Sequence, residues 1–380
     1  MRLTRWLFSM WIGCVLVFLP AESWASRRLD PVELSAVSAQ AAAMIDVQSG
    51  RILYEKNAGQ QMRIASLTKI MTAIVAIEDG DLTEKVKVKP GAVGVEGSSI
   101  YLKPGEEIPL EHLLYGLMLR SGNDAAVAIA EHIGGSVEGF VYKMNEKAEY
   151  LGLEKTHFQN PHGLDAKEHY SSAGDLARLT AYALKNPVFR KIVSTQVKTL
   201  PWPGEEWHRK WYNKNKMLRL YPGGDGVKTG FTKLSRRTLV SSATREGRQI
   251  ATVTLNAPDD WEDSMKLLEY GFRQFQPVQL VKKGKKFSSG QKERDSLEIV
   301  ASRSFTYPLL EKEQTQVEVR PMITYPLKKA RVAGIRVGTA RIFVEGKPVG
   351  SIPLITQGES EETVWGDWFT VLASIYEGEG

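Results

Sequence analysis

The sequence changes character near residue 280. Before about residue 277, apolar runs at helical spacing alternate with short β-type runs, which is typical of a domain that packs helices against a sheet. From residue 281 to about 356, short β-type runs such as 315–319 and 340–344 are separated by turns rich in Gly, Pro and Lys. A chain of 380 residues is long enough for two domains. We therefore expect an α/β domain followed by a small all-β domain.

Individual runs in the first part predict particular elements. Strands are expected at 40–46, 50–54, 237–244 and 249–255, the first two and the last two as neighbouring pairs. Helices are expected at 64–77, 110–133, 176–184 and 264–275. Ser172 and Asp175 match a capping box before the third of these helices.

The N-terminus predicts export. Arg2 and Arg5 precede an apolar run over residues 6–20, and small residues follow at the positions that a signal peptidase reads. Because the run is short for a membrane span, we expect cleavage after Ala25 rather than a retained anchor. The single cysteine, Cys14, lies in this segment, so the mature chain would have no thiol for disulfides, catalysis or zinc binding. The expected location is the outer face of the cytoplasmic membrane or the cell wall.

The charge of the chain is mild. The net charge is +6 and the pI is near 9.1, but the chain has no arginine-rich run and no basic patch interleaved with aromatic residues. Nucleic-acid binding is therefore not expected, and the simplest interpretation is that lysines keep the surface soluble.

Two groups of side chains invite a binding interpretation that their pattern does not favour. His157, His162 and His169 fit no standard set of zinc ligands, so we expect a structural loop, no metal and no cofactor. We expect the tryptophans of the next segment to pack a loop rather than to stack on a glycan; they are Trp202, Trp207 and Trp211.

The first of three short motifs is Ser66-Leu67-Thr68-Lys69, at the start of a predicted helix. Residues three apart on a helix share a face, so Ser66 and Lys69 are expected to be in contact. A serine hydroxyl needs a base to become a good nucleophile, and a lysine amine can act as that base if burial or a nearby cation lowers its pKa. The N-terminus of the helix adds backbone N–H groups that can hold an oxyanion. Alone, the motif is common.

The second motif is Ser121-Gly122-Asn123. The hydroxyl of Ser121 can relay a proton between a lysine base and a leaving amine. The amide of Asn123 can hold a substrate amide through both its donor and its acceptor. Taken alone, the simpler interpretation is a turn between helices, because all three residue types favour turns.

The third motif is Lys228-Thr229-Gly230, just before a predicted strand. A cation beside a hydroxyl suits a substrate carboxylate, and glycine lets the backbone approach the ligand closely. A phosphate-binding loop is excluded, because Val227 stands where that motif needs glycine. By itself the motif is also compatible with a turn that enters a strand.

Together, in this order and spacing, the motifs resemble the S-x-x-K, S-x-N and K-T-G signatures of penicillin-recognising serine hydrolases. Segments 64–72, 116–128, 158–165 and 226–232 are similar to those of low-molecular-mass penicillin-binding proteins of the D-alanyl-D-alanine carboxypeptidase family. The layout of the whole chain follows that family. Within it, the chain resembles most the carboxypeptidase that endospore-forming bacteria use on the spore cortex during sporulation.

The resemblance implies a role for each motif residue. Ser66 would be the acylated nucleophile, Lys69 its general base, Ser121 the proton relay and Asn123 a residue that positions the substrate peptide. Lys228 and Thr229 would bind the terminal carboxylate of D-alanine, Gly230 would line the same site, and the backbone N–H groups of Ser66 and Phe231 would form the oxyanion hole.

The resemblance also implies a fold, a substrate and a division of the chain. The fold would be a penicillin-binding or β-lactamase-like transpeptidase domain, with a mixed sheet flanked by helices. The substrates would be peptidoglycan stem pentapeptides, and β-lactam antibiotics would acylate the enzyme. The expected segments are a signal peptide (1–25), a catalytic domain (26–280), a β-rich domain (281–358) and an amphipathic tail (359–380).

One segment departs from the family. Some relatives carry an arginine that assists carboxylate binding in the loop before the last helix of the catalytic domain, where this chain reads Asp259-Asp260-Trp261-Glu262-Asp263. The carboxylate pocket would then rely on Lys228 and Thr229, or on an arginine that the sequence does not place.

Three other functions share part of this sequence pattern. Class A β-lactamases have Asp where this chain has Gly122, and the surroundings of Glu168 do not resemble their deacylating loop. A DD-endopeptidase that cleaves crosslinks is a closer relative of the predicted carboxypeptidase. A non-catalytic wall-binding protein would not need every motif residue that this chain retains.

The tail predicts peripheral membrane contact. Its apolar residues recur at helical spacing: Trp365, Trp368, Phe369, Leu372, Ile375 and Tyr376. From Glu359 onward the tail has no lysine or arginine, so binding would depend on apolar burial alone. The alternative is that this helix packs on the protein's own second domain.

Overall fold

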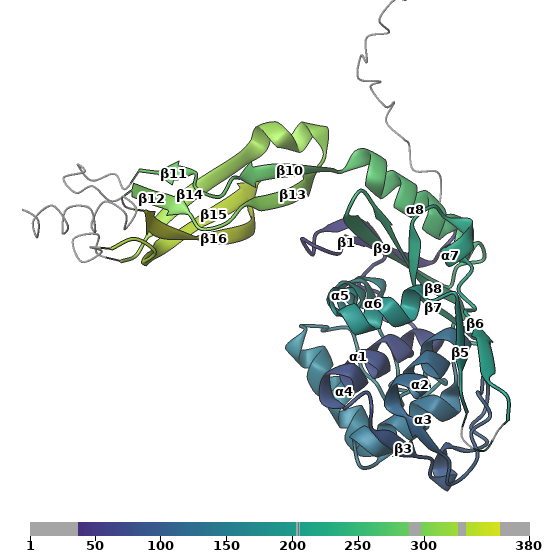
Figure 1. Ribbon diagram of the computed structural model, residues 1–380. Coiled ribbons are helices and arrows are strands. Elements are labelled where there is room, and N and C mark those ends of the chain that lie inside the picture. Colours follow the sequence, from purple (N-terminus) through teal and green to yellow (C-terminus); the bar gives the residue numbers. More distant parts are fainter. Residues whose placement is uncertain (1–36, 203, 205, 289–297, 326–331, 358–380) are drawn as a thin grey trace, which may run out of the picture.

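The computed structural model describes residues 37–202, 204, 206–288, 298–325 and 332–357. The predicted signal peptide and the predicted amphipathic tail lie outside these residues. Figure 1 shows a larger unit, in which helices surround a sheet, and an elongated β unit that extends away from it beyond helix α8. Within the described part of the chain, no helix has the length and apolar character needed to cross a bilayer.

The larger unit is built on a five-stranded sheet of order β2-β1-β9-β8-β7. Its strands are β1 (Ala41–Asp46), β2 (Ile52–Lys56), β7 (Gly224–Thr232), β8 (Arg236–Arg245) and β9 (Arg248–Leu255). The predicted pairs β1–β2 and β8–β9 are confirmed. The expectation of a mixed sheet is wrong in one respect, because every pairing is antiparallel. Short turns between consecutive strands reverse the chain direction, as they must in antiparallel hairpins.

Helices cover both faces of this sheet, as expected. On β1, Ala43 and Ile45 face a large core with α1, α3 and α5, while Met44 faces a second core with α8. The helices are α1 (Lys69–Asp79), α2 (Leu110–Tyr115), α3 (Asn123–Ile133), α4 (Val137–Tyr150), α5 (Ala173–Lys185), α6 (Pro187–Ser194), α7 (Met217–Leu220) and α8 (Asp260–Gln274). Two small hairpins complete the unit: β3 (Lys85–Lys87) with β4 (Glu107–Pro109), and β5 (Val197–Leu200) with β6 (Arg209–Tyr212).

Side-chain caps begin three of the described helices, at Ser136 for α4, Ser172 for α5 and Asn186 for α6. The side chain of Ser172 accepts a hydrogen bond from the backbone N–H of Asp175, so the predicted cap of α5 is confirmed. The expected continuous helix over 110–133 is wrong. The chain forms α2, a π-helical turn η3 (Gly116–Arg120), a break at Ser121, and then α3. Ser121 has a left-handed backbone (φ 64°), which no α-helix accommodates.

In the described residues from 276 to 357, the second unit is all-β apart from one 3-10 turn, as predicted. Strands β10 (Gln276–Val281) and β13 (Phe305–Leu309) pair, and a five-stranded antiparallel sheet has the order β11-β12-β16-β15-β14. Its strands are β11 (Lys286–Phe287), β12 (Glu298–Ala301), β14 (Val317–Ile323), β15 (Arg336–Val344) and β16 (Lys347–Gln357). The strand expected from residue 315 begins two residues later, because the 3-10 turn η4 (Glu311–Gln316) precedes it.

Arg51, just before β2, joins the two units. Its guanidinium forms a two-pronged ion pair with Glu313 of η4, with one contact of 2.9 Å, and donates to the carbonyl of Pro308. It also lies 5.2 Å from the ring centres of Phe275 and Tyr307. Both charged side chains are largely buried, with exposed fractions of 16% and 7%. We call this contact the Arg51 junction.

Candidate active site

The three sequence motifs meet at one pocket of about 360 Å³. The 3-10 turn η1 (Ala65–Thr68) brings Ser66, the break between η3 and α3 brings Ser121, and edge strand β7 brings Thr229. The complete lining is Ser66, Ser98, Ser121, Lys214, Thr229, Gly230, Phe231, Arg237, Asp260 and Trp261. The other motif residues, Lys69, Asn123 and Lys228, are buried behind this surface.

Ser66 and Lys69 are in contact, as the spacing predicts. The Nζ atom of Lys69 lies 3.1 Å from the Oγ atom of Ser66. The same Nζ lies 2.6 Å from the side-chain oxygen of Asn123 and 2.6 Å from the backbone oxygen of His162. Lys69 is fully buried, and these three oxygens are the hydrogen-bond partners that the described residues give its amine.

Burial and neighbouring cations lower the pKa of both buried lysines. Burial has the largest effect on Lys69, whose pKa falls well below its ordinary value, and the charges of Lys228 and Lys214 lower it further against the opposing effect of Asp124. Burial, and then Lys214, lowers the pKa of Lys228 to about 7. The Nζ atom of Lys228 donates to the backbone oxygen of Thr229 at 2.7 Å.

The second motif forms a rigid corner of the pocket. Ser121 is only 5% exposed, and within the described residues its hydroxyl has no hydrogen-bond partner. Asn123 uses both ends of its amide within the protein, because it accepts from Lys69 and donates to the backbone oxygen of Glu96 at 2.5 Å. The strained backbone of Ser121 therefore holds an unpaired hydroxyl at the pocket surface.

Gly230 lets strand β7 lie close against the turn that carries Ser66. A Cβ atom at this position would lie 2.5 Å from the side-chain oxygen of Thr238 and 3.2 Å from the Cβ of Ala65. Thr238 in turn donates to the backbone oxygen of Ile64. The absence of a side chain at Gly230 therefore permits this close packing of β7 against β8 and against the turn at Ile64 and Ala65, and the approach of the backbone to a ligand stays a prediction.

The loop at residues 158–165 provides the backbone oxygen that accepts a hydrogen bond from Lys69. The side chain of Asn160 accepts from the N–H of Gly163 and donates to the oxygen of Leu164, which fixes the shape of the loop. Thr72 of α1 donates to the oxygen of Pro161 at 2.6 Å, next to the His162 oxygen that receives Lys69. The sequence marked this segment only by its resemblance to the family, with no role attached.

The histidines of this region hydrogen-bond within it. The ring of His169 contacts the hydroxyl of Thr68 at 2.8 Å, and its Nδ1 atom accepts from the N–H of Gln159. His157 donates from Nδ1 to the oxygen of Glu168. Burial is the main cause that lowers the pKa of His169 to about 4. These contacts agree with the interpretation as a structural loop.

Several pocket residues carry no sequence signal. Lys214 donates to the hydroxyl of Ser98 at 3.1 Å across the pocket rim. The backbone around Ser98 is held by the buried carboxylate of Asp124, which accepts from the hydroxyl of Ser99 and from the N–H of Ile100. Only tertiary contacts bring these segments together, so no local pattern could have identified them.

Of the three tryptophans, Trp202 and Trp211 are buried and pack edge to face with ring centres 5.5 Å apart. The expectation of loop packing is confirmed for this pair. Trp207 is 67% exposed, so the expectation is wrong for this residue.

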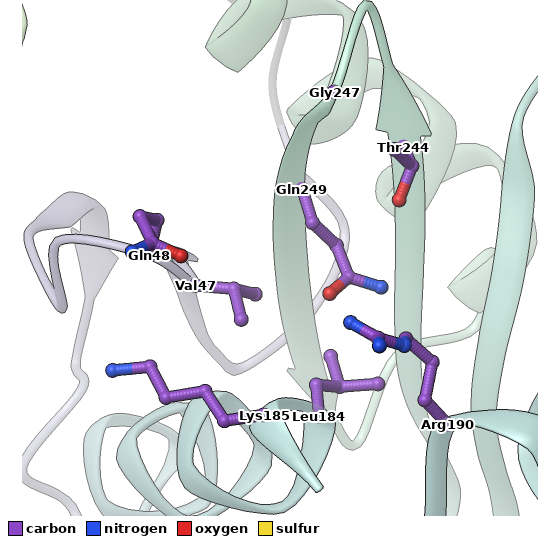
Figure 2. Close-up of a pocket in the computed structure, with 8 residues that line it drawn as sticks. All are labelled: Val47, Gln48, Leu184, Lys185, Arg190, Thr244, Gly247 and Gln249. Carbon is purple, nitrogen blue, oxygen red and sulfur yellow. The ribbon is translucent and has the colours of Figure 1, made fainter. Parts of the chain in front are cut away.

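A second hollow of about 440 Å³ lies elsewhere on the larger unit. Figure 2 shows Lys185 and Leu184 on one helix and Gln249 and Thr244 on two neighbouring strands around it. None of the motif residues lines this hollow. The chemistry expected from the sequence therefore belongs to the pocket at Ser66.

Comparisons with known proteins agree with this site. Residues 28–259 match the family described as D-alanyl-D-alanine carboxypeptidase, and residues 275–362 match the C-terminal domain of penicillin-binding protein 5. The chain is 31% identical to D-alanyl-D-alanine carboxypeptidase DacF of Bacillus subtilis, over 96% of this chain and 98% of that protein. It is 34% identical to DacC of Escherichia coli, over 92% of this chain and 91% of that protein.

Solved structures show the same relationship. Penicillin-binding protein 5 from Haemophilus influenzae superimposes with a TM-score of 0.70 and 29% identity, over 85% of this chain and 97% of that one. Penicillin-binding protein 6B from Escherichia coli gives a TM-score of 0.66 with 29% identity, over 86% and 97%. With three motifs at one pocket and a family match over most of its length, this chain belongs to the D-alanyl-D-alanine carboxypeptidase family of penicillin-binding serine hydrolases.

Proposed function

We propose that this chain removes the terminal D-alanine from peptidoglycan stem peptides through an acyl-enzyme on Ser66. The observation that carries the proposal is the 3.1 Å contact between the Ser66 hydroxyl and a buried lysine amine whose pKa is lowered. A lysine in such a site is neutral at a pH where an exposed lysine is charged, so it can accept the serine proton.

The surroundings of Lys69 orient its lone pair. A neutral amine has two N–H groups and one lone pair. The oxygens of Asn123 and His162 can only accept, so they take the two N–H groups. The lone pair is then left for the hydroxyl proton of Ser66. In this arrangement Asn123 orients the amine of Lys69 by accepting one of its N–H groups. This role adds to the contact with the substrate peptide that the family resemblance implies.

The reaction then follows in two stages. The Oγ atom of Ser66 attacks the carbonyl carbon between the two D-alanines, its proton passes to Lys69, and the N–H groups of Ser66 and Phe231 hold the oxyanion. Ser121 relays this proton from Lys69 to the leaving amine, the C–N bond breaks, and free D-alanine departs with Lys69 neutral again. A water molecule then gives a proton to Lys69 and attacks the ester carbon. The C–O bond to Ser66 breaks, Lys69 returns the proton to Oγ of Ser66, and the shortened peptide leaves.

Thr229 and Lys228 act at the carboxylate end in different ways. Thr229 lines the pocket and can donate its hydroxyl to the substrate. Lys228 is 2% exposed and is absent from the lining, so it contributes charge from behind the surface.

A β-lactam would acylate Ser66 by the same first stage. Its amide bond opens, and the leaving amine stays tethered to the ester. Among the lining residues the one carboxylate is Asp260, and it is paired with Arg237. With no glutamate there to activate water, we expect a long-lived adduct rather than the rapid turnover of a β-lactamase.

The test uses the mature protein with a muramyl pentapeptide and with penicillin. Wild-type protein should release one D-alanine per peptide and gain the mass of one penicillin. Ser66→Ala should lose both, by several orders of magnitude in rate, while Ser302→Ala in the second unit should retain both. Penicillin labelling of folded Ser66→Ala protein would contradict the assignment. Cleavage of crosslinked dimers in preference to pentapeptides would favour an endopeptidase, and no adduct at all would favour a wall-binding protein.

We also propose that the protein works outside the cytoplasmic membrane, with domains at 26–280 and 281–358. The predicted signal peptide and the wall substrate of the family support this location. For the predicted tail, flotation with liposomes can compare the mature protein with a version that ends at Gln357. Equal flotation of the two would exclude a membrane anchor in the tail.

A further inference from the structure

A cation outside the three motifs faces the active-site pocket. Arg237 of β8 is paired in register with Phe231 of β7, and both side chains line the pocket. Directly opposed residues of two strands share a face, and so does every second residue along one strand. Thr229 therefore lies on the same face as Arg237, as its diagonal neighbour at roughly 7–8 Å.

Asp260 holds the guanidinium of Arg237 in place. One oxygen of this carboxylate accepts from Nε at 3.0 Å and from Nη2 at 2.6 Å. Asp260 is 4% exposed at the first residue of α8, and the same oxygen accepts from the N–H of Trp261. The Nη1 group of Arg237 has no hydrogen-bond partner within the described residues, and its side chain is 47% exposed.

The pocket needs a cation that a substrate can reach. Lys228 is buried and bonded to the backbone, so it is not at the surface. The two cations that line the pocket are Lys214 and Arg237. Lys214 donates to the hydroxyl of Ser98. Arg237 is the diagonal neighbour of Thr229, and its Nη1 group has no hydrogen-bond partner among the described residues. A planar guanidinium matches a carboxylate better than an ammonium does.

We propose that Arg237, oriented by Asp260, binds the C-terminal carboxylate of the substrate together with the hydroxyl of Thr229. The inference rests on the proposed carboxypeptidase function and names a specificity-determining residue for it. It also explains the departure noted in the sequence, because the loop that lacks an arginine instead supplies the aspartate that holds an arginine of the neighbouring strand.

The test compares two peptides that end in D-Ala-D-Ala, one with a free terminal carboxylate and one with that carboxylate amidated. For Arg237→Gln we expect kcat/KM on the free acid to fall about 10- to 100-fold, which matches the loss of a charge-assisted hydrogen bond. The rate on the amide should change little, so the preference for the free acid should collapse. Arg237→Lys should keep part of the preference, and Asp260→Asn should weaken it less than Arg237→Gln does.

Arg236→Gln is the matched control, since its exposed side chain makes no hydrogen bond or ion pair among the described residues and should leave the preference unchanged. The preference is a ratio measured on one preparation, so a partly unfolded sample does not alter it. An unchanged ratio in Arg237→Gln, or a ratio in Arg237→Lys as low as in Arg237→Gln, would overturn the inference. Failure of wild-type protein to release D-alanine would instead refute the proposed function.

Discussion

The two buried lysines of the active site influence each other's protonation. Lys69 must be neutral to act as a base, and Lys228 lowers its pKa only while it is charged itself. Since the pKa of Lys228 is about 7, its charge is partly lost near neutral pH. Lys214 lowers the pKa of both lysines, so this rim residue helps to set the pH range in which acylation is fast.

Replacement of Lys214 should shift the pH profile of acylation. In Lys214→Met the positive charge that lowers the pKa of Lys69 is removed, so that pKa rises and the acid limb of the acylation rate moves to higher pH. At a pH on this limb, penicillin acylation should become several-fold slower. Stopped-flow acylation across pH measures the limb. Lys216→Met, an exposed lysine two residues away, should leave it in place, and a shift to lower pH in Lys214→Met would contradict the prediction.

At the scale of residues, the sequence could predict contacts between residues that are close in sequence or belong to one motif. The contact of Ser66 with Lys69 follows from a spacing of three residues. The engagement of Lys69 with the oxygen of His162 could not be predicted, because it joins residues 93 apart through the backbone. The place of Arg237 at the pocket could not be predicted either, because it depends on the register of two strands and on the contact with Asp260.

At the scale of elements, the loop at 158–165 determines whether the base is held in place. Gly163 has a left-handed backbone (φ 89°), and a Cβ atom there would lie 1.9 Å from the oxygen of Ala65. The turn that carries Ser66 and the loop that receives Lys69 therefore touch through this glycine. A side chain at this point would push the two apart.

Gly163→Ala should destabilise the protein and slow acylation together. Gly152→Ala is its control, since Gly152 also has positive φ but open space around it. The control should lose about 1 kcal/mol from backbone strain. Gly163→Ala should lose roughly 1–3 kcal/mol more from the clash, and its acylation rate should fall at least about tenfold. Urea unfolding and penicillin labelling measure the two effects, and similar behaviour of both variants would show that the contact with Ala65 is unimportant.

His169, which accepts a hydrogen bond from Gln159 of the same loop, makes the stability of the protein sensitive to acid. Its pKa is about 4 in the folded protein against 6.5 when exposed, so the unfolded chain binds the proton more readily between these values. The free energy of unfolding should therefore fall as pH decreases from 6.5 to 4, on the order of 3 kcal/mol for this group. His169→Gln should reduce this dependence in urea titrations without abolishing it, because burial also lowers the pKa of His162, to about 3. His208→Gln, at an exposed position, should keep the wild-type dependence. An equal slope in wild type and His169→Gln would argue against this role.

Element predictions from the sequence failed where tertiary contacts override local pattern. The apolar spacing over 110–133 is continuous, yet the helical run ends at Ser121, whose left-handed backbone no apolar pattern signals and whose side chain lines the pocket. The strands and the cap of α5 were predictable, since alternation and a side-chain cap are local properties.

At the scale of the whole molecule, the Arg51 junction should couple the unfolding of the two units. Arg51→Ala leaves Glu313 buried without its partner, which typically costs about 3–5 kcal/mol. We expect calorimetry to show the second unit unfolding at a lower temperature than the first. Penicillin acylation at 25 °C should be unchanged, because no residue of the junction lines the pocket at Ser66.

The control for this prediction is Arg320→Ala on β14. Arg320 pairs with Glu318, but both side chains are more than half exposed, and such pairs contribute about 0–1 kcal/mol. This variant should unfold like the wild type. A single unchanged transition in Arg51→Ala would show that other contacts hold the units together.

The elongated shape of the second unit gives the Arg51 junction a mechanical consequence. A body attached near one end acts as a lever, so a small rotation at the attachment becomes a larger displacement at the far end. The two-pronged geometry of Arg51 with Glu313 resists such rotation more than a single contact would. The Arg51 junction, of which this ion pair is a part, should therefore help to limit how far the larger unit rotates relative to any surface that holds the far end of the second unit.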